Sequence, residues 1–340
     1  MAKELVSFVI CTYNQEKYIE KAIEAAFSQT YSPLQIIISD DCSTDHTFDI
    51  IEKIVSSYSG PHVVNVNRNN ENLGIAKHWD YISRKAIGDL IVHAAGDDIS
   101  FPNRAEELVK VWKSLNPRPI LLSSNGISMS LSGVNSKPVR TDHHSEHLLV
   151  QHGPRAFDFD NIDIPVCGFA LAVDKTLYKK NKPITRRMWS EDEILRSRAL
   201  LWGSIVFLPK ILVRYRDGGL SKGVDQCQFS YLKLYKNQSL SRLNYLEQLL
   251  DDCNSEYKNS SLIIEKKIQK KIRSAKRRIN MIQTPHFIYS LQMLITQLIY
   301  SKNEGISKLE YLKFYLVKWA PDLFFTFRRY IKKINNSYHG

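Results

Sequence analysis

The first 120 residues alternate between short apolar runs and longer segments with apolar residues every three or four positions. Four runs have the length and composition of buried strands: 5–11, 34–39, 63–66 and 89–94. Three segments between them carry apolar residues on one helical face: 16–29, 45–58 and 74–86. This order predicts an α/β fold of βαβ units, with a mostly parallel central sheet and helices on both faces.

The alternation fades after about residue 120. Residues 125–165 are polar and rich in Ser, His, Asp and Pro, which predicts loops and short antiparallel strands. A helix is expected near Ser190 and a strand over 204–213, and from about residue 226 the pattern is that of long helices. We therefore expect an α/β domain over 1–225 and a basic, mainly helical region over 226–340.

Composition excludes several classes of protein. Of the 340 residues, 43% are hydrophobic and 24% are charged, so disordered, collagen-like and coiled-coil architectures are excluded. The five cysteines include no closely spaced pair, which argues against a disulfide scaffold or a zinc ribbon and favours a reducing cytosol. No secretory signal and no run of about 18 apolar residues is visible, so we expect a cytoplasmic protein without a spanning helix.

The net charge of +12 is confined to the last third of the chain. Residues 226–340 hold 20 Lys or Arg and 8 Asp or Glu, whereas residues 1–225 hold 27 of each. Such asymmetry indicates an anionic partner for the helical region, either a membrane surface or nucleic acid, or else a solvated helical face.

Polar clusters follow three of the expected strands. They are Thr12-Tyr13-Asn14, Asp40 to Asp45, and Gly96-Asp97-Asp98. Because ligands bind at the carboxyl ends of parallel strands, we expect these clusters to meet at one edge of the sheet.

Two acidic pairs stand out in these clusters. Asp97 and Asp98 repel each other unless a cation neutralises them, and carboxylates suit Mg²⁺ or Mn²⁺; the alternative is an acidic turn. Asp40 and Asp41 could accept hydrogen bonds from a nucleobase or ribose. The alternative there is that Ser43 or Thr44 caps the next helix.

Motifs of other nucleotide-binding and hydrolytic classes are absent. The chain has no Gly-x-Gly-x-x-Gly after the first strand and no P-loop, and it lacks the His-Glu-x-x-His and Gly-x-Ser-x-Gly motifs. Dinucleotide-binding, P-loop, zinc protease and serine hydrolase functions therefore lose their main support.

Five motifs in this order resemble a family 2 glycosyltransferase with the GT-A fold. They are 6–14, Ser28-Gln-Thr-Tyr, Ile38-Ser-Asp-Asp-Cys-Ser-Thr-Asp, Asn72-Leu-Gly and Ala95-Gly-Asp-Asp. The resemblance covers about residues 5–225. It implies an inverting transfer from a nucleotide-sugar donor, most often a UDP-sugar, in bacterial surface polysaccharide assembly such as capsule or O-antigen synthesis.

The resemblance also implies roles for the clustered residues. Cys11, Thr12, Tyr13 and Asn14 match the strip that lines the base, and Asp41 matches the aspartate that reads it. Asp97 and Asp98 match the metal-binding pair, with Asp98 as the direct ligand of Mn²⁺ or Mg²⁺. Gly74 and Lys77 fall where the family approaches the nucleotide, and Arg216 and Ser221 match a loop near the diphosphate.

Inversion also needs a base that removes the proton of the acceptor hydroxyl. Ser190-Glu191-Asp192-Glu193 resembles the family's Glu-Asp motif, which implies Asp192 as the base with Glu191 as the alternative. Ser190 and Glu193 also have capping-box spacing, so Glu193 is expected to be structural. Cys167-Gly168-Phe169 resembles the acceptor-side segment.

The basic region lies outside the resemblance. Lysines and arginines repeat at helical spacing over 266–278, apolar residues mark a face over 287–298, and 319–333 mixes aromatic with basic residues. This composition suits peripheral attachment to the inner face of the cytoplasmic membrane. Packing or homo-oligomerisation is the alternative, and nucleic-acid binding is less favoured because no motif accompanies it.

The combined prediction is a metal-dependent glycosyltransferase that acts on a glycan or lipid-linked acceptor. Two other functions remain open. One is a non-catalytic nucleotide-sugar-binding or scaffold protein at the membrane, and the other is a nucleotidyltransferase, which shares the need for metal and nucleotide.

Overall fold

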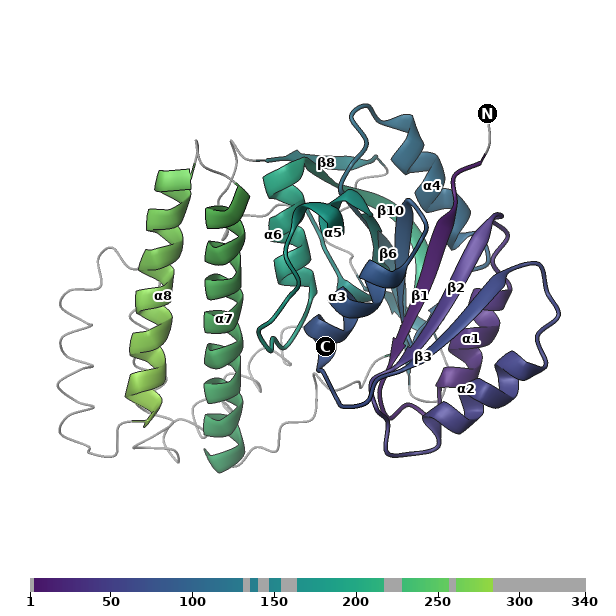
Figure 1. The fold of residues 1–340 in the computed structure, drawn as a ribbon, viewed down its shortest axis with the longest axis horizontal. Coiled ribbons are helices and arrows are strands. Elements are labelled where there is room, and N and C mark those ends of the chain that lie inside the picture. The colour runs from purple at the N-terminus through teal and green to yellow at the C-terminus, as the bar shows by residue number, and fades with distance from the viewer. Residues whose placement is uncertain are drawn as a thin grey trace, which may run out of the picture. The chain divides into compact units, whose positions relative to one another are not determined.

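The computed structural model describes residues 3–130, 135–139, 147–153, 164–216, 228–256 and 261–283. The chain divides into two compact units, Met1–Lys222 and Gly223–Gly340. Figure 1 shows the helices and strands of both units.

One mixed sheet organises the first unit. Its strands within the described residues are β1 (Val6–Thr12), β2 (Leu34–Asp40), β3 (Val63–Arg68), β4 (Leu90–Ala95), β5 (Ile99–Ser100), β6 (Leu121–Met129), β7 (Asn135–Pro138), β8 (Leu149–His152), β9 (Leu171–Asp174) and β10 (Ser204–Arg216). The strand order is β3-β2-β1-β4-β9-β6-β10-β5, with β7 beside β6 and β8 beside β10. β3, β2, β1 and β4 are mutually parallel, β6 is parallel to β10, and β9 runs antiparallel between β4 and β6.

The helices of this unit cover both faces of the sheet. They are α1 (Ile19–Phe27), α2 (Thr47–Ser56), α3 (Ile75–Lys85), α4 (Arg104–Ser114), α5 (Thr176–Lys180) and α6 (Asp192–Trp202), with a 3₁₀ turn η1 (Gly168–Ala170). Ile23 of α1, Ile51 of α2 and Trp112 of α4 share one core with Phe8 and Ile36, so these three helices cover the same face. α3 lies on the opposite face, because the strand order reverses direction between β3 and β4 (Figure 1).

The predicted α/β architecture is confirmed. β1 and β2 are buried along their whole length, which explains why their sequences are mostly apolar without a regular alternation of apolar and polar residues. Every predicted element of the first 95 residues is present, with ends shifted by no more than three residues.

The prediction fails after residue 95 in two places. α4 was not anticipated, and neither was the nine-residue strand β6 over 121–129. The short antiparallel strands that we expected over 125–165 are present as β7 and β8. The second half of β6 contains serine, asparagine and glycine, whose low strand propensity is overridden by pairing with β10 and β7.

The described residues of the second unit form two long helices, α7 (Gln228–Glu256) and α8 (Ser261–Gln283). They pack against each other, and an ion pair of 3.3 Å joins Lys276 Nζ of α8 to Glu247 Oε1 of α7. No helix of the described residues is both long and apolar enough to cross a bilayer. The predicted apolar face over 287–298 and the aromatic and basic segment over 319–333 lie outside the described residues.

Candidate active site

The three polar clusters meet at one edge of the sheet, as the sequence predicted. β1 lies between β2 and β4, with Thr12 paired to Asp40 and Cys11 paired to Ala95. Beyond the strands, Asp41 N–H donates to the carbonyl of Thr12 at 3.0 Å, and Gly96 N–H donates to that of Cys11 at 3.0 Å.

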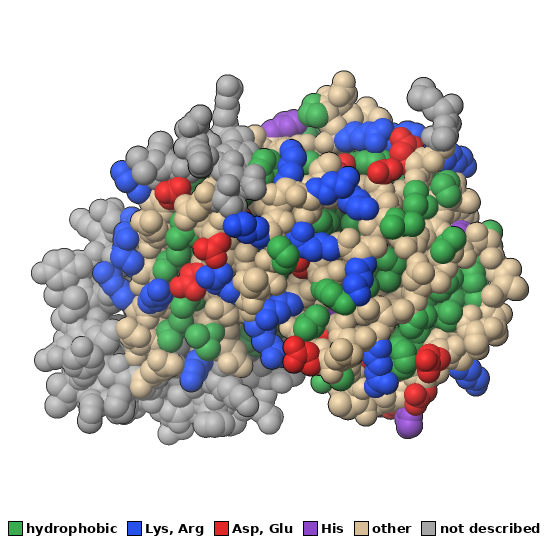
Figure 2. Space-filling model, viewed as in Figure 1, with side chains coloured by type: hydrophobic (Ala, Val, Ile, Leu, Met, Phe, Trp, Pro, Cys, Tyr) green, Lys and Arg blue, Asp and Glu red, His purple; other side chains and the backbone are tan. Residues whose placement is uncertain are grey.

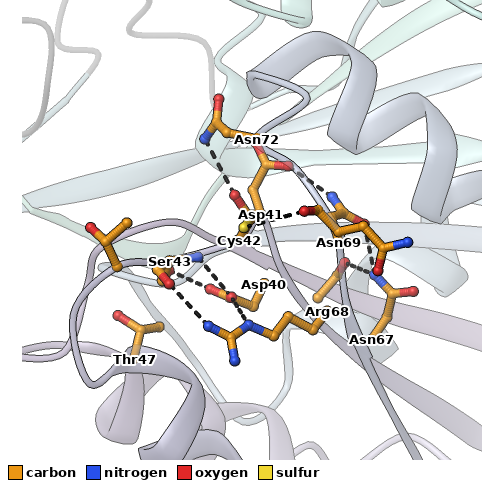
Figure 3. A network of polar contacts seen from close by, with 12 residues as sticks. Asp40, Asp41, Cys42, Ser43, Thr47, Asn67, Arg68, Asn69 and Asn72 are labelled. Carbon is orange, nitrogen blue, oxygen red and sulfur yellow. Dashed lines mark hydrogen bonds and ion pairs between the residues drawn. The ribbon is translucent and has the colours of Figure 1, made fainter.

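Asp40 stabilises the turn that follows β2. Its fully buried carboxylate accepts a hydrogen bond from Ser43 N–H at 2.9 Å and another from the Ser43 hydroxyl, and it lies 3.5 Å from Arg68 Nε (Figure 3). The predicted capping by Ser43 or Thr44 is wrong, because α2 begins only at Thr47 and has no side-chain cap. Asp45 accepts from Thr47 N–H instead, at 3.0 Å.

Asp41 holds the segment before α3. Its Oδ1 accepts hydrogen bonds from Asn69 Nδ2 at 2.8 Å and Leu73 N–H at 2.9 Å, and its Oδ2 accepts one from Gly74 N–H at 2.9 Å (Figure 3). The side chain is buried, so these three donors satisfy a carboxylate that water does not reach. One lone pair on Oδ2 remains for a further donor. The predicted base-reading role stays a prediction.

The residues that follow β1 contact the loop after β2 at this edge of the sheet. Asn14 adopts a left-handed conformation (φ 51°), which asparagine tolerates well. Its backbone N–H donates to Ser43 Oγ at 2.9 Å and its Oδ1 accepts from Thr44 N–H at 2.9 Å, so Asn14 joins the loops after β1 and β2. Thr12 is buried and Tyr13 is 38% exposed, so of these two Tyr13 presents a ring to solvent.

Gly74 and Lys77 lie at the start of α3. Gly74 is the N-cap and has a φ of +78°, a conformation that other residues rarely adopt. A side chain there would also lie 3.1 Å from Arg187 Nε. Lys77 is half-buried in the first turn of the helix.

Asp97 and Asp98 are both hydrogen-bonded to Arg216, the last residue of β10. Arg216 N–H donates to Asp98 Oδ1 at 2.9 Å, and Arg216 Nε donates to the Asp97 carbonyl at 3.0 Å. Asp98 Oδ2 is buried and has no hydrogen-bond partner. Burial raises the pKa of the Asp97 carboxyl, and burial together with the charge of Asp97 raises that of Asp98 well above its usual range.

These features fit a divalent cation. An unpartnered buried carboxylate oxygen beside a second carboxylate is a donor that a hard cation satisfies. No group of three or more His, Cys, Asp or Glu side chains in the described part of the chain could hold a metal. Asp97 and Asp98 are the residues that would hold such an ion, with phosphate and water as further ligands, and the metal site stays a prediction.

Arg216 has a different environment from the one expected. The guanidinium is buried, lies 4.3 Å from the centre of the Tyr18 ring, and donates to the Ser130 carbonyl at 3.3 Å. Arg216 therefore orders the acidic pair, and contact with a phosphate stays a prediction. Ser221 lies outside the described residues.

Glu191 and Asp192 stand at the start of α6 in contrasting environments. Burial and the charge of Asp192 raise the pKa of the Glu191 carboxyl to about 8. Asp192 is half-buried, and its Oδ1 accepts from Ser190 Oγ at 2.6 Å and Glu193 N–H at 2.8 Å. The predicted capping box is wrong, because Glu191 rather than Ser190 is the N-cap and no side-chain cap bond forms.

The Glu191 carboxylate reaches the same edge of the sheet as the other clusters. A Cβ on Gly168 would lie 2.7 Å from Glu191 Oε1, so the predicted acceptor-side segment is beside this carboxylate. Burial raises the pKa of the Cys11 thiol, and the charges of Glu191 and Asp41 raise it further. Glu191 and Asp41 therefore both lie within electrostatic reach of the end of β1.

Arg104 is the main residue of this site that the sequence did not reveal. It is fully buried and donates to Ser100 Oγ at 2.8 Å and to the carbonyls of His93 at 2.7 Å and Phe169 at 3.2 Å. One guanidinium thus joins β4, β5 and the turn beside Glu191. A single arginine outside any recognised motif gives no sequence signal for such burial, because arginine is almost never fully buried.

Comparisons with known proteins agree with this geometry. Residues 7–172 match the family model described as Glycosyl transferase family 2. An uncharacterized glycosyltransferase of Haemophilus influenzae is 26% identical over 219 residues, which cover 63% of this chain and 66% of the relative. The UDP-Glc:alpha-D-GlcNAc-diphosphoundecaprenol beta-1,3-glucosyltransferase WfaP of Escherichia coli is 54% identical over 54 residues, 16% of this chain and 22% of that protein.

Solved structures share the fold. Staphylococcus aureus TarS 1–349 in complex with UDP-GlcNAc has a TM-score of 0.55 at 16% identity and covers 94% of this chain and 91% of its own. The mannosyltransferase PcManGT of Pyrobaculum calidifontis, in complex with GDP-Man and Mn²⁺, has a TM-score of 0.51 at 14% identity, covering 88% and 76%. At this identity the likeness concerns the GT-A fold alone.

The match rests on the α/β unit. The chain spans between about a third and two thirds of the length of the first curated relatives that it matches. The family model falls on β1 to β9, the part of the sheet that carries the strand-end clusters. Through this region, residues 7–172, the chain matches glycosyl transferase family 2.

Proposed function

We propose that this protein is an inverting, metal-dependent glycosyltransferase that moves a sugar from a nucleotide-sugar donor to a hydroxyl of a glycan or lipid-linked acceptor. The observation that carries the proposal is the meeting of two acidic pairs at one sheet edge. Asp97–Asp98 follows β4 beside β1, and the Glu191 carboxylate lies against Gly168 of the turn η1, which contacts β4. The Asp97–Asp98 pair suits the binding of a cation, and the Glu191–Asp192 pair suits a proton transfer.

The nucleotide end of the donor is assigned to the loops after β1 and β2. Cys11, Thr12, Tyr13 and Asn14 would line the base, and Asp41 has one lone pair left for a base or ribose donor. Gly74, the N-cap of α3, is hydrogen-bonded to Asp41, and Lys77 lies in the first turn of this helix, whose positive end favours an anionic ligand. UDP is the favoured nucleotide, and the fold relative TarS, which holds UDP-GlcNAc, supports it.

Asp98, with Asp97, would hold Mn²⁺ or Mg²⁺ against the donor diphosphate. When bound, the cation neutralises charge that develops on the leaving diphosphate. The chain's own contribution is to fix the pair: Arg216 N–H holds Asp98 Oδ1 and leaves Oδ2 without a partner. The mannosyltransferase PcManGT was solved with GDP-Man and Mn²⁺, which supports a metal site in this fold.

Asp192 is the proposed base. Ser190 Oγ and Glu193 N–H hold its Oδ1, so the other oxygen keeps its lone pairs for the proton of the acceptor hydroxyl. With a pKa of about 8, Glu191 is mostly protonated at neutral pH, which suits a hydrogen-bond donor to the sugar or acceptor better than a base. Neighbouring carboxyls in such different environments are typical of divided acid and base roles.

A lipid-linked acceptor in bacterial surface polysaccharide synthesis, such as capsule or O-antigen, is the proposed setting. The relative WfaP is named for transfer to a diphosphoundecaprenol-linked sugar, which supports this acceptor class. We also propose that residues 1–225 form the catalytic domain and that 226–340 is a separate basic module.

A thermal-shift screen tests the proposed function. Nucleotide sugars are added to the full chain with and without Mn²⁺, because a ligand that binds only the native state raises its melting temperature. We expect a rise with at least one nucleotide sugar, larger with Mn²⁺, and no rise with NAD as the matched control. No shift with any UDP- or GDP-sugar in Mn²⁺ would contradict the proposal.

A further inference from the structure

Helix α8 carries two stripes of opposite character on opposite sides. At 100° per residue, one stripe of basic residues falls within roughly 60° of the helix circumference. It consists of Lys266, Lys270, Arg273 and Arg277, and we call it the α8 basic stripe. The opposite side carries the residues that are buried: Ile264, Ile268, Ala275 and Ile279.

The α8 basic stripe is exposed along its whole length. From Lys266 to Arg277 it runs about 16 Å along the helix axis. Figure 2 shows Lys and Arg side chains gathered on the surface over α8. In sequence the helix contains eight Lys or Arg and one acidic residue, Glu265.

Intramolecular ion pairing does not account for three of the four residues of the stripe. Lys276 pairs with Glu247, but among the described residues no carboxylate lies within ion-pair distance of Lys266, Lys270 or Arg273. The α/β region 1–225 has no net charge and the helical region carries the whole excess. Parallel cations of one sign repel one another, so such a face gains stability when an anionic surface covers it.

We propose that the α8 basic stripe docks the protein on an anionic lipid surface. A straight line of cations matches the plane of lipid headgroups, and each Lys or Arg near such a surface strengthens binding by about fivefold. A single-stranded nucleic acid fits less well, because α8 contains no aromatic residue on which bases could stack. The inference is independent of the proposed function, since it needs neither donor nor metal.

The apolar side of α8 is already buried within the protein. Docking by this helix is therefore electrostatic, without insertion of its apolar residues into the bilayer. It should weaken with salt, because the Debye length shrinks from about 10 Å at 0.1 M to about 3 Å at 1 M.

Vesicle sedimentation of the full-length protein tests the proposal. The probe is an equimolar phosphatidylglycerol–phosphatidylcholine vesicle, with pure phosphatidylcholine as the uncharged reference. The variant Lys266→Gln/Lys270→Gln/Arg273→Gln removes three charges of the stripe. The matched control Lys21→Gln/Lys53→Gln/Lys179→Gln removes three exposed charges from the first unit. Circular dichroism checks that both remain folded.

We expect wild type and control to bind the anionic vesicles at low salt, and the stripe variant to bind on the order of 100-fold more weakly. Three results would overturn the proposal. The stripe variant could bind the anionic vesicles as tightly as wild type does, or the control variant could lose as much vesicle affinity as the stripe variant. Wild type could also ignore vesicles at low salt while binding single-stranded RNA or duplex DNA of equal charge.

Discussion

At the scale of single residues, the candidate carboxylates differ in what their oxygens contact. Asp41 has both oxygens occupied by donors of the chain, whereas Asp98 has one oxygen held by Arg216 N–H and one buried without a partner. Asp192 has one oxygen held by Ser190 and Glu193. These contacts separate residues that the sequence presents only as acidic pairs.

Replacing Asp192 should remove the proposed base without disturbing the donor. Asp192→Asn keeps an oxygen for Ser190 Oγ and Glu193 N–H, so the start of α6 is preserved. We expect transfer to slow by about 10²-fold or more, the usual scale for losing a general base, at unchanged donor affinity. Glu193→Gln is the matched control in the same helical turn. A wild-type rate for Asp192→Asn, measured by release of the nucleotide diphosphate, would exclude Asp192 as the base.

Glu191 should make the stability of the protein pH-dependent. Its pKa of about 8 in the folded state lies above the value of 4.5 expected for the unfolded chain, so the folded state binds the proton more tightly. Unfolding then releases protons, and stability falls as pH rises through the window from about 4.5 to 8. Below that window the carboxyl is protonated in both states and this effect vanishes.

Glu191→Gln should therefore gain stability relative to wild type as pH rises from 5 to 8, by at least about 1.4 kcal/mol, the equivalent of one pKa unit. Urea unfolding at several pH values measures this difference. A stability difference between Glu191→Gln and wild type that does not change with pH would show that the Glu191 carboxyl is exposed to water rather than buried against Gly168.

At the scale of elements, the site depends on loops that are held by side chains rather than by strands. The strands and helices of the first 95 residues follow from apolar periodicity, because β1 and β2 are buried on both faces and α1 to α3 are amphipathic. The order of the clusters at the sheet edge follows from parallel pairing. The sequence could thus place the candidate residues together.

Features set by tertiary contacts could not be predicted in this way. β6 is a strand because β9 and β10 flank it, although its residues have mixed propensity. Arg104 is buried because carbonyls of β4 and of the turn at Phe169 converge on it. The division of hydrogen bonds among Asp40, Asp41 and Ser43 depends on atomic positions that no periodicity encodes.

The Asp41 contacts predict that replacing Asp41 lowers the stability of the protein as well as its affinity for the donor. Asp41→Ala leaves three donors, Asn69 Nδ2, Leu73 N–H and Gly74 N–H, without their acceptor. We expect a loss of about 1–3 kcal/mol in the free energy of unfolding, measured by urea denaturation. Glu52→Ala, at an exposed position of α2, should change stability by less than about 0.5 kcal/mol. An Asp41→Ala protein as stable as wild type would show that Asp41 serves ligand binding alone.

At the scale of the whole molecule, chemistry and charge are divided between two units. The carboxylates of the candidate site belong to the unit Met1–Lys222, and the α8 basic stripe belongs to Gly223–Gly340. The family match falls entirely in the first unit. Donor binding and lipid binding should therefore respond to different substitutions, so a loss of one leaves the other intact.

The binding of UDP with and without Mn²⁺ is the most direct test of the central claim, a metal-dependent donor site at Asp97–Asp98. Asp98→Asn keeps an acceptor for Arg216 N–H but removes the charge. Calorimetry on wild type should give tighter UDP binding in Mn²⁺ by more than about tenfold, or 1.4 kcal/mol, and Asp98→Asn should lose that gain at an unchanged melting temperature. Equal UDP affinity with and without Mn²⁺ in wild type, or an undiminished gain in Asp98→Asn, would contradict the account.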